Sequence, residues 1–164
     1  MRNIGISVLL FLLLLVGCGS NTNSAVLNLH NISFLAEVTC NNMAYSVDCC
    51  IGTNKDFSAT VVSPDYLSGI TYSLENGNSV FSYEGVRISD IDLLLPDDNF
   101  LVLFKEILCT CDGAVFDANK GKNTVIGNIG GNSYSIVASP SGLPISMMID
   151  GIGAKITFKN VTCL

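Results

Sequence analysis

The cysteines are the residues of this 164-residue sequence with the widest chemistry open to them. A thiol can act as a nucleophile, bind a metal, accept an acyl group or form a disulfide. The seven positions are Cys18, Cys40, Cys49, Cys50, Cys109, Cys111 and Cys163. The pair Cys109 and Cys111 lacks the two-residue gap of a zinc knuckle, and the only histidine, His30, is far away in sequence. Structural disulfides or buried thiols are therefore favoured over metal binding and redox chemistry.

Other catalytic arrangements find little support in the sequence. With one histidine, a Ser–His–Asp arrangement would depend on His30, and no Gly-x-Ser-x-Gly motif is present. We expect His30 to be a surface residue at the entry of the domain. The carboxylate pairs Asp90/Asp92 and Asp97/Asp98 flank a predicted helix start, where capping or solvation explains them. We expect a protein that is not an enzyme and that has no cofactor.

Cys18 ends an apolar run that begins near Ile4, with Arg2 ahead of the run and the uncharged polar stretch 19–24 behind it. The thirteen residues 4–16 are short for a membrane-spanning helix, which needs about 20. A short positive region, an apolar middle and a small residue before a cleavage point are typical of a secretory signal. The alternative is an uncleaved anchor or a buried helix.

The four residues Leu15-Val16-Gly17-Cys18 resemble the lipobox of bacterial lipoprotein signal peptides. The resemblance implies that Cys18 is diacylated on sulfur, cut free after Gly17 and acylated on its new amine. Such an anchor gives stable membrane attachment. We therefore expect a signal peptide at 1–17, the lipidated cysteine with a disordered tether at 18–26, and one domain at 27–164. The protein would lie on the extracytoplasmic face of the cell membrane.

The 147 residues that would follow cleavage suit one domain with a sizeable core. They hold 14 carboxylates against seven Lys and Arg, a net charge of −7. Because an anionic chain is not attracted to phosphates or to acidic lipid surfaces, we expect no nucleic-acid partner, and the acyl chains would hold the protein at the membrane. The six remaining cysteines permit disulfides outside the cytoplasm, with 15 possible connectivities.

Two hairpins are predicted from alternating apolar residues around turn-forming pairs. The first turns at Asn41-Asn42, and the second at Asn76-Gly77. In each, the register places the apolar residues of both strands on one face. The predicted cross-strand pairs are Val38–Tyr45, Ala36–Val47 and Phe34–Cys49 in the first hairpin, and Leu74–Ser79, Tyr72–Phe81 and Ile70–Tyr83 in the second.

The period changes after Pro96, where apolar residues recur every three and four positions. This predicts one helix over 97–110 that ends at Asp112-Gly113 and is buried on most sides. Further strands are expected at 57–62, 114–117, 124–129, 134–138, 145–149 and 154–158. The fold class is therefore mainly β (α+β), with a curved antiparallel sheet, or open half-barrel, of about eight to ten strands wrapped around one main apolar helix.

Several strand-and-turn segments resemble the LolA/LolB-type lipoprotein carriers and their relatives among Firmicute membrane lipoproteins of the GerS type. The segments are 61–64 with Leu67, 69–72, Gly77 with 81–85, 130–136 and 142–145. The resemblance covers roughly residues 33–160. It implies an open antiparallel half-barrel covered by helices, with an apolar cavity.

Two interpretations of the apolar residues inside this sheet remain open. They either fill an ordinary core or line an incompletely filled cavity that takes a lipid or an acyl chain. The first interpretation goes with an envelope interaction or scaffold lipoprotein that binds a protein partner, and the second with a binder of an apolar ligand. The candidate cavity residues are Phe34, Val38, Tyr45, Val47, Tyr72, Phe81, Tyr83, Phe100 and Phe104.

The first hairpin register also bears on the disulfides, because it points Cys49 to the apolar face and Cys50 to the other. Cys109 and Cys111 likewise point in different directions at the helix end. We therefore predict at least one long-range bridge from the helix end to the N-terminal hairpin, which carries Cys40, Cys49 and Cys50. Cys163 could bond only near the sheet edge.

Overall fold

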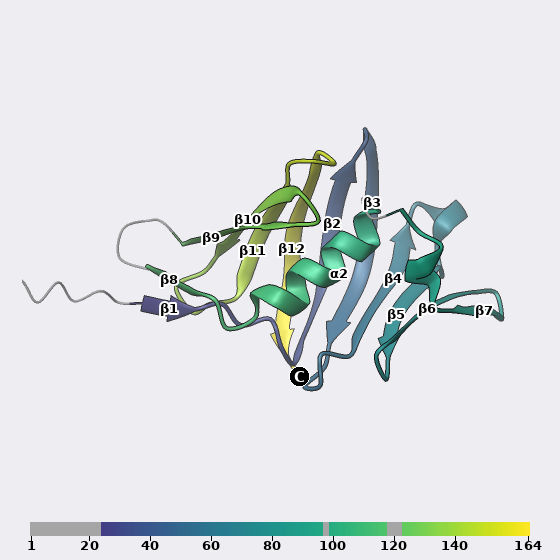
Figure 1. Cartoon of the computed structure of the whole chain (residues 1–164), viewed down its shortest axis with the longest axis horizontal. Helices are drawn as coiled ribbons and strands as arrows, with labels where there is room; N and C mark the ends of the chain where they lie inside the picture. Colours follow the sequence, from purple (N-terminus) through teal and green to yellow (C-terminus); the bar gives the residue numbers. More distant parts are fainter. Residues whose placement is uncertain (1–23, 97–98, 118–122) are drawn as a thin grey trace, which may run out of the picture.

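The computed structural model of the chain describes residues 24–96, 99–117 and 123–164, and more than half of them lie in antiparallel strands. Ten strands form one sheet in the order β7-β6-β5-β4-β3-β2-β12-β11-β10-β9, and β1 pairs with β8 in a second, two-stranded sheet (Figure 1). Within the described residues the large sheet is not closed, and β7 and β9 form its edges. The bounds are β1 Ser24–Val26, β2 Ile32–Cys40, β3 Met43–Ile51, β4 Phe57–Ser63, β5 Thr71–Glu75, β6 Asn78–Tyr83, β7 Val86–Ser89, β8 Val115–Asp117, β9 Thr124–Ile129, β10 Asn132–Ala138, β11 Pro144–Ile149 and β12 Ala154–Cys163.

The register predicted for the first hairpin is confirmed. Asn41 and Asn42 both adopt a positive φ at the turn, a conformation that asparagine tolerates well. The strands β2 and β3 pair as predicted, with the partners Val38–Tyr45, Ala36–Val47 and Phe34–Cys49. Cys49 is buried in the core, whereas Cys50 points to the other face of the sheet.

The second hairpin follows its predicted register up to Thr71. Asn76 and Gly77 form the turn with positive φ, and β5 and β6 pair Leu74 with Ser79 and Tyr72 with Phe81. The predicted pair Ile70–Tyr83 is wrong. The Ile70 N–H donates to the Leu67 carbonyl, and the Ile70 carbonyl accepts the Val61 N–H, so Ile70 belongs to the preceding loop.

The predicted helix is present as α2, which spans Phe100–Cys111. The Asn99 side chain caps it by accepting the Leu101 N–H at 3.0 Å, while Asp97 and Asp98 lie outside the described residues. The helix ends at Asp112, and Gly113 follows with φ +82°, as the Asp-Gly pair predicted. In the part of the chain that the structure describes, α2 is the one α-helix, and the short 3₁₀ helices η1 (Asp65–Leu67) and η2 (Ile91–Leu93) accompany it.

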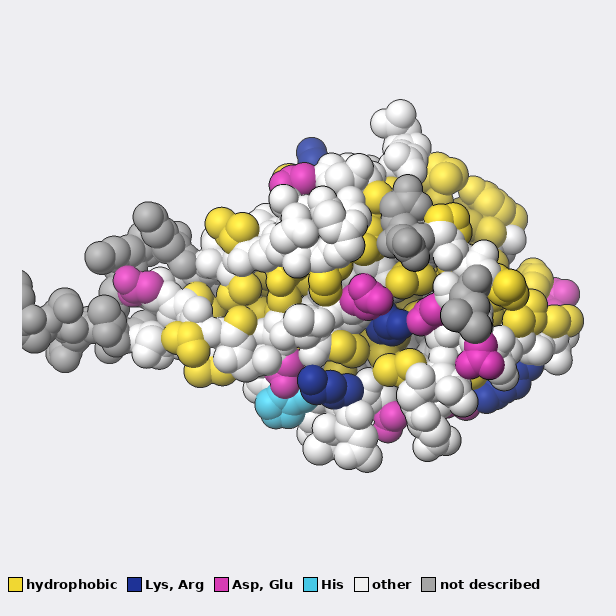
Figure 2. Space-filling view, in the orientation of Figure 1, with side chains coloured by type: hydrophobic (Ala, Val, Ile, Leu, Met, Phe, Trp, Pro, Cys, Tyr) yellow, Lys and Arg dark blue, Asp and Glu magenta, His cyan; other side chains and the backbone are white. Residues whose placement is uncertain are grey.

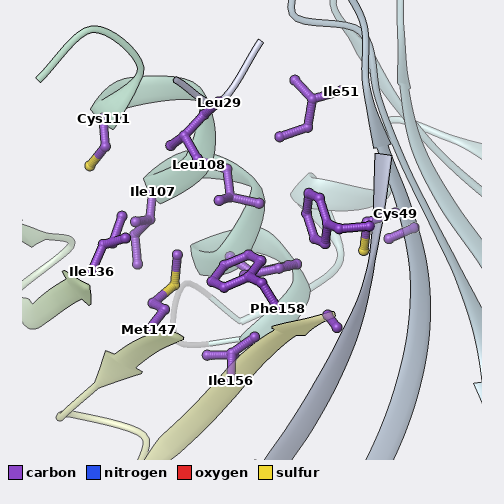
Figure 3. Packing of buried hydrophobic residues seen from close by; sticks show 14 of the residues in the cluster. Leu29, Cys49, Ile51, Ile107, Leu108, Cys111, Ile136, Met147, Ile156 and Phe158 are labelled. Carbon is purple, nitrogen blue, oxygen red and sulfur yellow. The ribbon is translucent and has the colours of Figure 1, made fainter. Parts of the chain in front are cut away.

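The core lies between α2 and one face of the large sheet, where α2 crosses β12, β2 and β3 (Figure 1). Phe104 is fully buried at its centre and contacts the rings of Phe34, Phe57 and Phe158. Figure 3 shows Ile107 of α2 beside Ile136 of β10, where both side chains are completely buried. The helix is therefore held by aromatic and aliphatic packing over most of its length.

The last three residues assigned to the tether by the sequence form a strand instead. Residues 24–26 form β1, which pairs with β8 from Ser24–Asp117 to Val26–Val115. The next residues are also fixed, because the Leu27 N–H donates to Ala114. Sequence periodicity missed β1 because it is only three residues long and its partner lies about ninety positions away.

The large sheet and this small one together have more strands than the eight to ten that the sequence predicted. No helix in the described ranges is long and apolar enough to cross a membrane.

Candidate functional site

A pocket of about 650 Å³ opens at the N-terminal end of α2. One wall comes from the helix-facing side of β3–β6, and the opposite wall from the residues around Leu95 and the start of α2. The turns that follow β2 and β11 close one side. The lining residues are Cys40, Asn41, Met43, Tyr45, Val47, Val61, Leu67, Ile70, Tyr72, Phe81, Leu95, Pro96, Asn99, Phe100, Leu101, Gly151 and Ile152.

Five of the nine predicted cavity residues line this pocket, namely Tyr45, Val47, Tyr72, Phe81 and Phe100. Three others, Phe34, Val38 and Phe104, are buried in the packed core instead. Tyr83 lies at the end of β6 and contributes to neither. The sequence predicts one interior lined by these nine residues of the sheet and the helix, and the structure divides that interior into a filled part and a hollow part.

Sequence reasoning missed the residues that loops bring to the pocket. Leu67 is the last residue of η1, Leu95 lies two residues after η2, and Ile152 lies in the turn between β11 and β12. None of these segments is long enough to show a period, so no pattern marks them as inward-facing. Val61 is different, because its alternation with Ala59 and Phe57 on β4 places it on the inner face.

The lining carries polar groups but no Lys, Arg, Asp or Glu among the described residues. Its polar side chains include the amides of Asn41 and Asn99 and the hydroxyl of Tyr45, which lies 3.3 Å from the Met43 sulfur. Exposed apolar side chains, including Met43, Tyr66 and Leu94, lie on the loops and strand ends of this part of the molecule. Figure 2 shows hydrophobic side chains at the end of the molecule that carries β4–β7. An uncharged, mostly apolar pocket of this size is suited to an apolar ligand.

A cluster of three polar side chains, Tyr72, Asp92 and Lys105, adjoins the pocket through Tyr72, which is one of the lining residues. Asp92 of η2 accepts the Tyr72 hydroxyl at 2.5 Å and the Lys105 ammonium at 2.6 Å. The Asp92 N–H donates to the Ser79 hydroxyl at 3.0 Å, and the Lys105 nitrogen lies 5.8 Å from the centre of the Tyr72 ring. Lys105 thus has a partner for its charge although it is buried on a mostly apolar helix.

The electrostatics of this cluster favour the ionised carboxylate. Burial alone would raise the pKa of Asp92, but the hydrogen bonds from Lys105 and Tyr72 hold that pKa below its usual range. Burial, followed by the hydrogen bond to Asp92, raises the pKa of the Tyr72 hydroxyl, which therefore stays protonated as the donor. The cluster ties η2 to β5 and α2, and so fixes the position from which Leu95 and Pro96 enter the pocket wall.

The predicted long-range disulfide is wrong, because all six cysteines among the described residues are free. The Cys111 thiol donates to the Tyr134 hydroxyl of β10 at 3.0 Å and so faces away from the N-terminal hairpin. Cys40 lies at the far end of β2, 3.7 Å from the Ile152 carbonyl oxygen. Cys163 is exposed at the end of β12. The strand register predicts the faces of Cys49 and Cys50 correctly, but it does not define the distance between these cysteines and those at the end of α2.

Cys40 is the one of these thiols that lines the pocket. Burial raises its pKa, and the thiol is therefore neutral at physiological pH. The pKa of Cys49 is raised more strongly by the same cause. A raised pKa lowers the thiolate fraction and slows the reaction of a thiol with electrophiles, which argues against a catalytic cysteine at either position.

His30 lies on the surface, as the sequence predicted, and contacts the Asp112 carboxylate at 3.1 Å. Asp112 also accepts the Leu29 N–H at 2.8 Å, so it joins the end of α2 to the segment before β2. These contacts explain both residues as structural. No group of three potential metal ligands forms within the described part of the chain.

No model of a known protein family matches this chain, and no curated protein matches it either.

Proposed function

We propose that the protein is a membrane-anchored extracytoplasmic lipoprotein that binds an apolar ligand, a lipid or an acyl chain, and that it does so without catalysis. The observation that carries the ligand proposal is the pocket of about 650 Å³, whose lining has aromatic and aliphatic residues and no charged side chain among those described. Ligand pockets typically enclose about 300–1,000 Å³ and are lined mainly by such residues. The pocket thus favours the cavity interpretation over a completely filled core.

The fold supports the same proposal in a coarser way. An open antiparallel sheet with one apolar helix on its face agrees with the half-barrel that the resemblance to LolA/LolB-type carriers implies. In that arrangement the sheet curves around the helix, and the space left between them holds the ligand. The Lys105–Asp92–Tyr72 cluster supports a stable wall, because it fixes η2 at the side of the pocket.

The anchor proposal depends on the lipobox at residues 15–18. Metabolic labelling with a clickable fatty acid, comparing the wild type with Cys18→Ala, tests it. We expect the wild type to be labelled and recovered with membranes, and Cys18→Ala to be unlabelled. Equal labelling of the two chains, or a wild type recovered in the soluble fraction, would contradict the anchor.

Native mass spectrometry of the protein released from membranes tests the ligand proposal. We expect a fraction of the protein to carry an added mass that matches a lipid and that organic solvent removes. A clean mass together with a stable dimer or a complex with another protein would favour the envelope scaffold instead.

A further inference from the structure

The outer face of the large sheet, opposite α2, has two chemically different halves. On its central strands the outward positions are mostly polar or charged, as in the row Thr157, Glu37 and Ser46 across β12, β2 and β3. On β9, β10 and β11 the same face carries Ile126, Val137 and Met148. These three side chains are exposed by 76%, 37% and 40%.

The strand register makes these three side chains neighbours. Ser135 of β10 pairs with Ile126 on one side and with Met148 on the other, and Val137 is the next outward residue of β10. Diagonal positions two residues apart on adjacent strands lie about 7–8 Å from each other, within reach of aliphatic side chains. The inward neighbours Ile136 and Met147 are buried, which confirms the assignment of faces. The outer apolar patch, defined as Ile126, Val137 and Met148, is therefore continuous around a small serine.

The start of the described chain lies close to this patch. Ser24 starts β1, which pairs with β8, and β8 contacts β9 next to the patch. Cys18 is six residues before Ser24 and can lie at most about 20 Å from it, since a residue spans no more than about 3.3–3.6 Å. Two further exposed valines, Val26 and Val115, are cross-strand partners at this end of the molecule (Figure 1).

We propose that the outer apolar patch rests on the lipid bilayer into which the acyl chains of Cys18 insert. This inference depends on the anchor in the proposed function. Lys155 of β12 pairs with Met148 and lies beside the patch, where a cation suits the phosphate level of the membrane. The patch adds a second, weaker attachment to the acyl anchor, and its main effect is to orient the domain.

In this orientation the pocket faces away from the bilayer. The patch is on the face of the sheet opposite α2, and the pocket is on the same face as α2. With the patch on the bilayer, the helix-covered face and its pocket are turned away from the membrane to which the protein is anchored. A ligand would therefore enter from the side that faces away from this bilayer.

The sequence contains no tryptophan, so a single introduced tryptophan reports its own surroundings. We would compare Val137→Trp with Val62→Trp in the full lipidated chain, reconstituted into vesicles of phosphatidylcholine and phosphatidylglycerol with brominated acyl chains. Val62 is the matched control because it is an exposed valine of β4, five strand positions from β10 in the sheet order. That separation is about 24 Å at 4.7–4.9 Å per strand. Ile126→Trp repeats the measurement should Val137→Trp fail to fold.

We expect Val137→Trp to be blue-shifted and to lose most of its emission to the bromine atoms, while Val62→Trp keeps its emission. A Val137→Trp variant that floats with the vesicles while its tryptophan emission is neither quenched nor blue-shifted would overturn the patch proposal. This result would leave the anchor intact. A blue shift without quenching would assign the patch to a second copy or another protein. Equal quenching at both positions would contradict a contact confined to the patch, because Val62 also lies on the outer face of the sheet. A wild type that does not float with the vesicles would overturn the anchor and the patch together.

Discussion

The two ends of α2 face the same sheet but differ in how they are packed. Toward its C-terminal end, Ile107 and Leu108 are completely buried among residues of β10–β12 and the segment before β2. At the N-terminal end, Phe100 and Leu101 are only partly buried and border the pocket. One helix therefore packs a core with one half and roofs a cavity with the other.

This difference shows that the apolar face of a helix, as predicted from the sequence, does not specify whether the helix covers a packed core or a cavity. The filled half uses strand residues in regular alternation, such as Ile136, Met147 and Ile156, whose side chains meet the helix directly. The hollow half is bounded by loops and 3₁₀ helices, which stand off from the sheet and leave the space between them unoccupied by protein. A ligand would therefore bind where regular packing stops.

The largest expected effect is a difference in stability between the alanine variants of two phenylalanines that lie one helical turn apart. Phe104→Ala should lower the free energy of unfolding by about 3–5 kcal/mol, because it removes a fully buried ring and leaves a cavity. Phe100→Ala should cost clearly less, because its ring stacks on Phe104 but borders the pocket on its other side. Chemical denaturation of both variants measures the two values. Equal losses would show that the first turn of α2 is packed as tightly as the middle of the helix.

How far the sequence anticipates this arrangement differs between its elements. Alternation with a turn pair gave both hairpins and their faces, and the three-and-four spacing gave α2, because these signals are local. The division between core and pocket depends on contacts with Leu67, Leu95 and Ile152, which lie in segments without a period. Two further contacts could not be predicted from the sequence, namely the pairing of β1 with β8 and the ion pair between Lys105 and Asp92. Each joins segments of which at least one shows no periodic pattern of apolar residues.

The second effect concerns the polar cluster of Tyr72, Asp92 and Lys105. Lys105→Met should lower the free energy of unfolding by about 1–3 kcal/mol, because the partly buried Asp92 carboxylate loses a charged partner. Lys159→Met is the control, since the Lys159–Glu37 pair is exposed at 3.6 Å and such pairs contribute about 1 kcal/mol or less. Lys105→Met should also weaken lipid binding, because η2 supports the pocket wall. Two variants of equal stability would contradict the role given to the cluster.

The third effect tests the filled half. Gly127→Ala would place a Cβ 2.1 Å from the Tyr134 hydroxyl oxygen, so the ring must move and its hydrogen bond with Cys111 must break. Burial raises the pKa of Tyr134 to about 12, so its phenol is neutral at physiological pH. We expect a loss of about 1–2 kcal/mol in unfolding free energy from this overpacking. Gly52→Ala, whose Cβ meets its nearest atom at an ordinary 3.6 Å, should change stability by less than about 1 kcal/mol. A Gly127→Ala variant as stable as Gly52→Ala would show that this half can also adapt.

The smallest effect needs no substitution and reports on the pocket alone. Cys40 lines the pocket and Cys163 is exposed at the end of β12, so one protein carries both the probe and its control. Oleic acid should slow the alkylation of Cys40 by iodoacetamide severalfold and leave the rate at Cys163 unchanged. Peptide mapping by mass spectrometry gives both rates. Equal protection of the two thiols would indicate that oleic acid acts elsewhere or non-specifically.

The most direct test of the account is whether a ligand that purifies with the protein is lost when the pocket is filled. Native mass spectrometry would compare the wild type with Ile70→Trp, which places an indole at a partly buried lining position, and with Ile145→Trp, an exposed position on β11. We predict that the wild type and Ile145→Trp carry the same added lipid mass and that Ile70→Trp carries little or none. The same added mass on all three chains, or on none of them, would contradict an apolar ligand in this pocket.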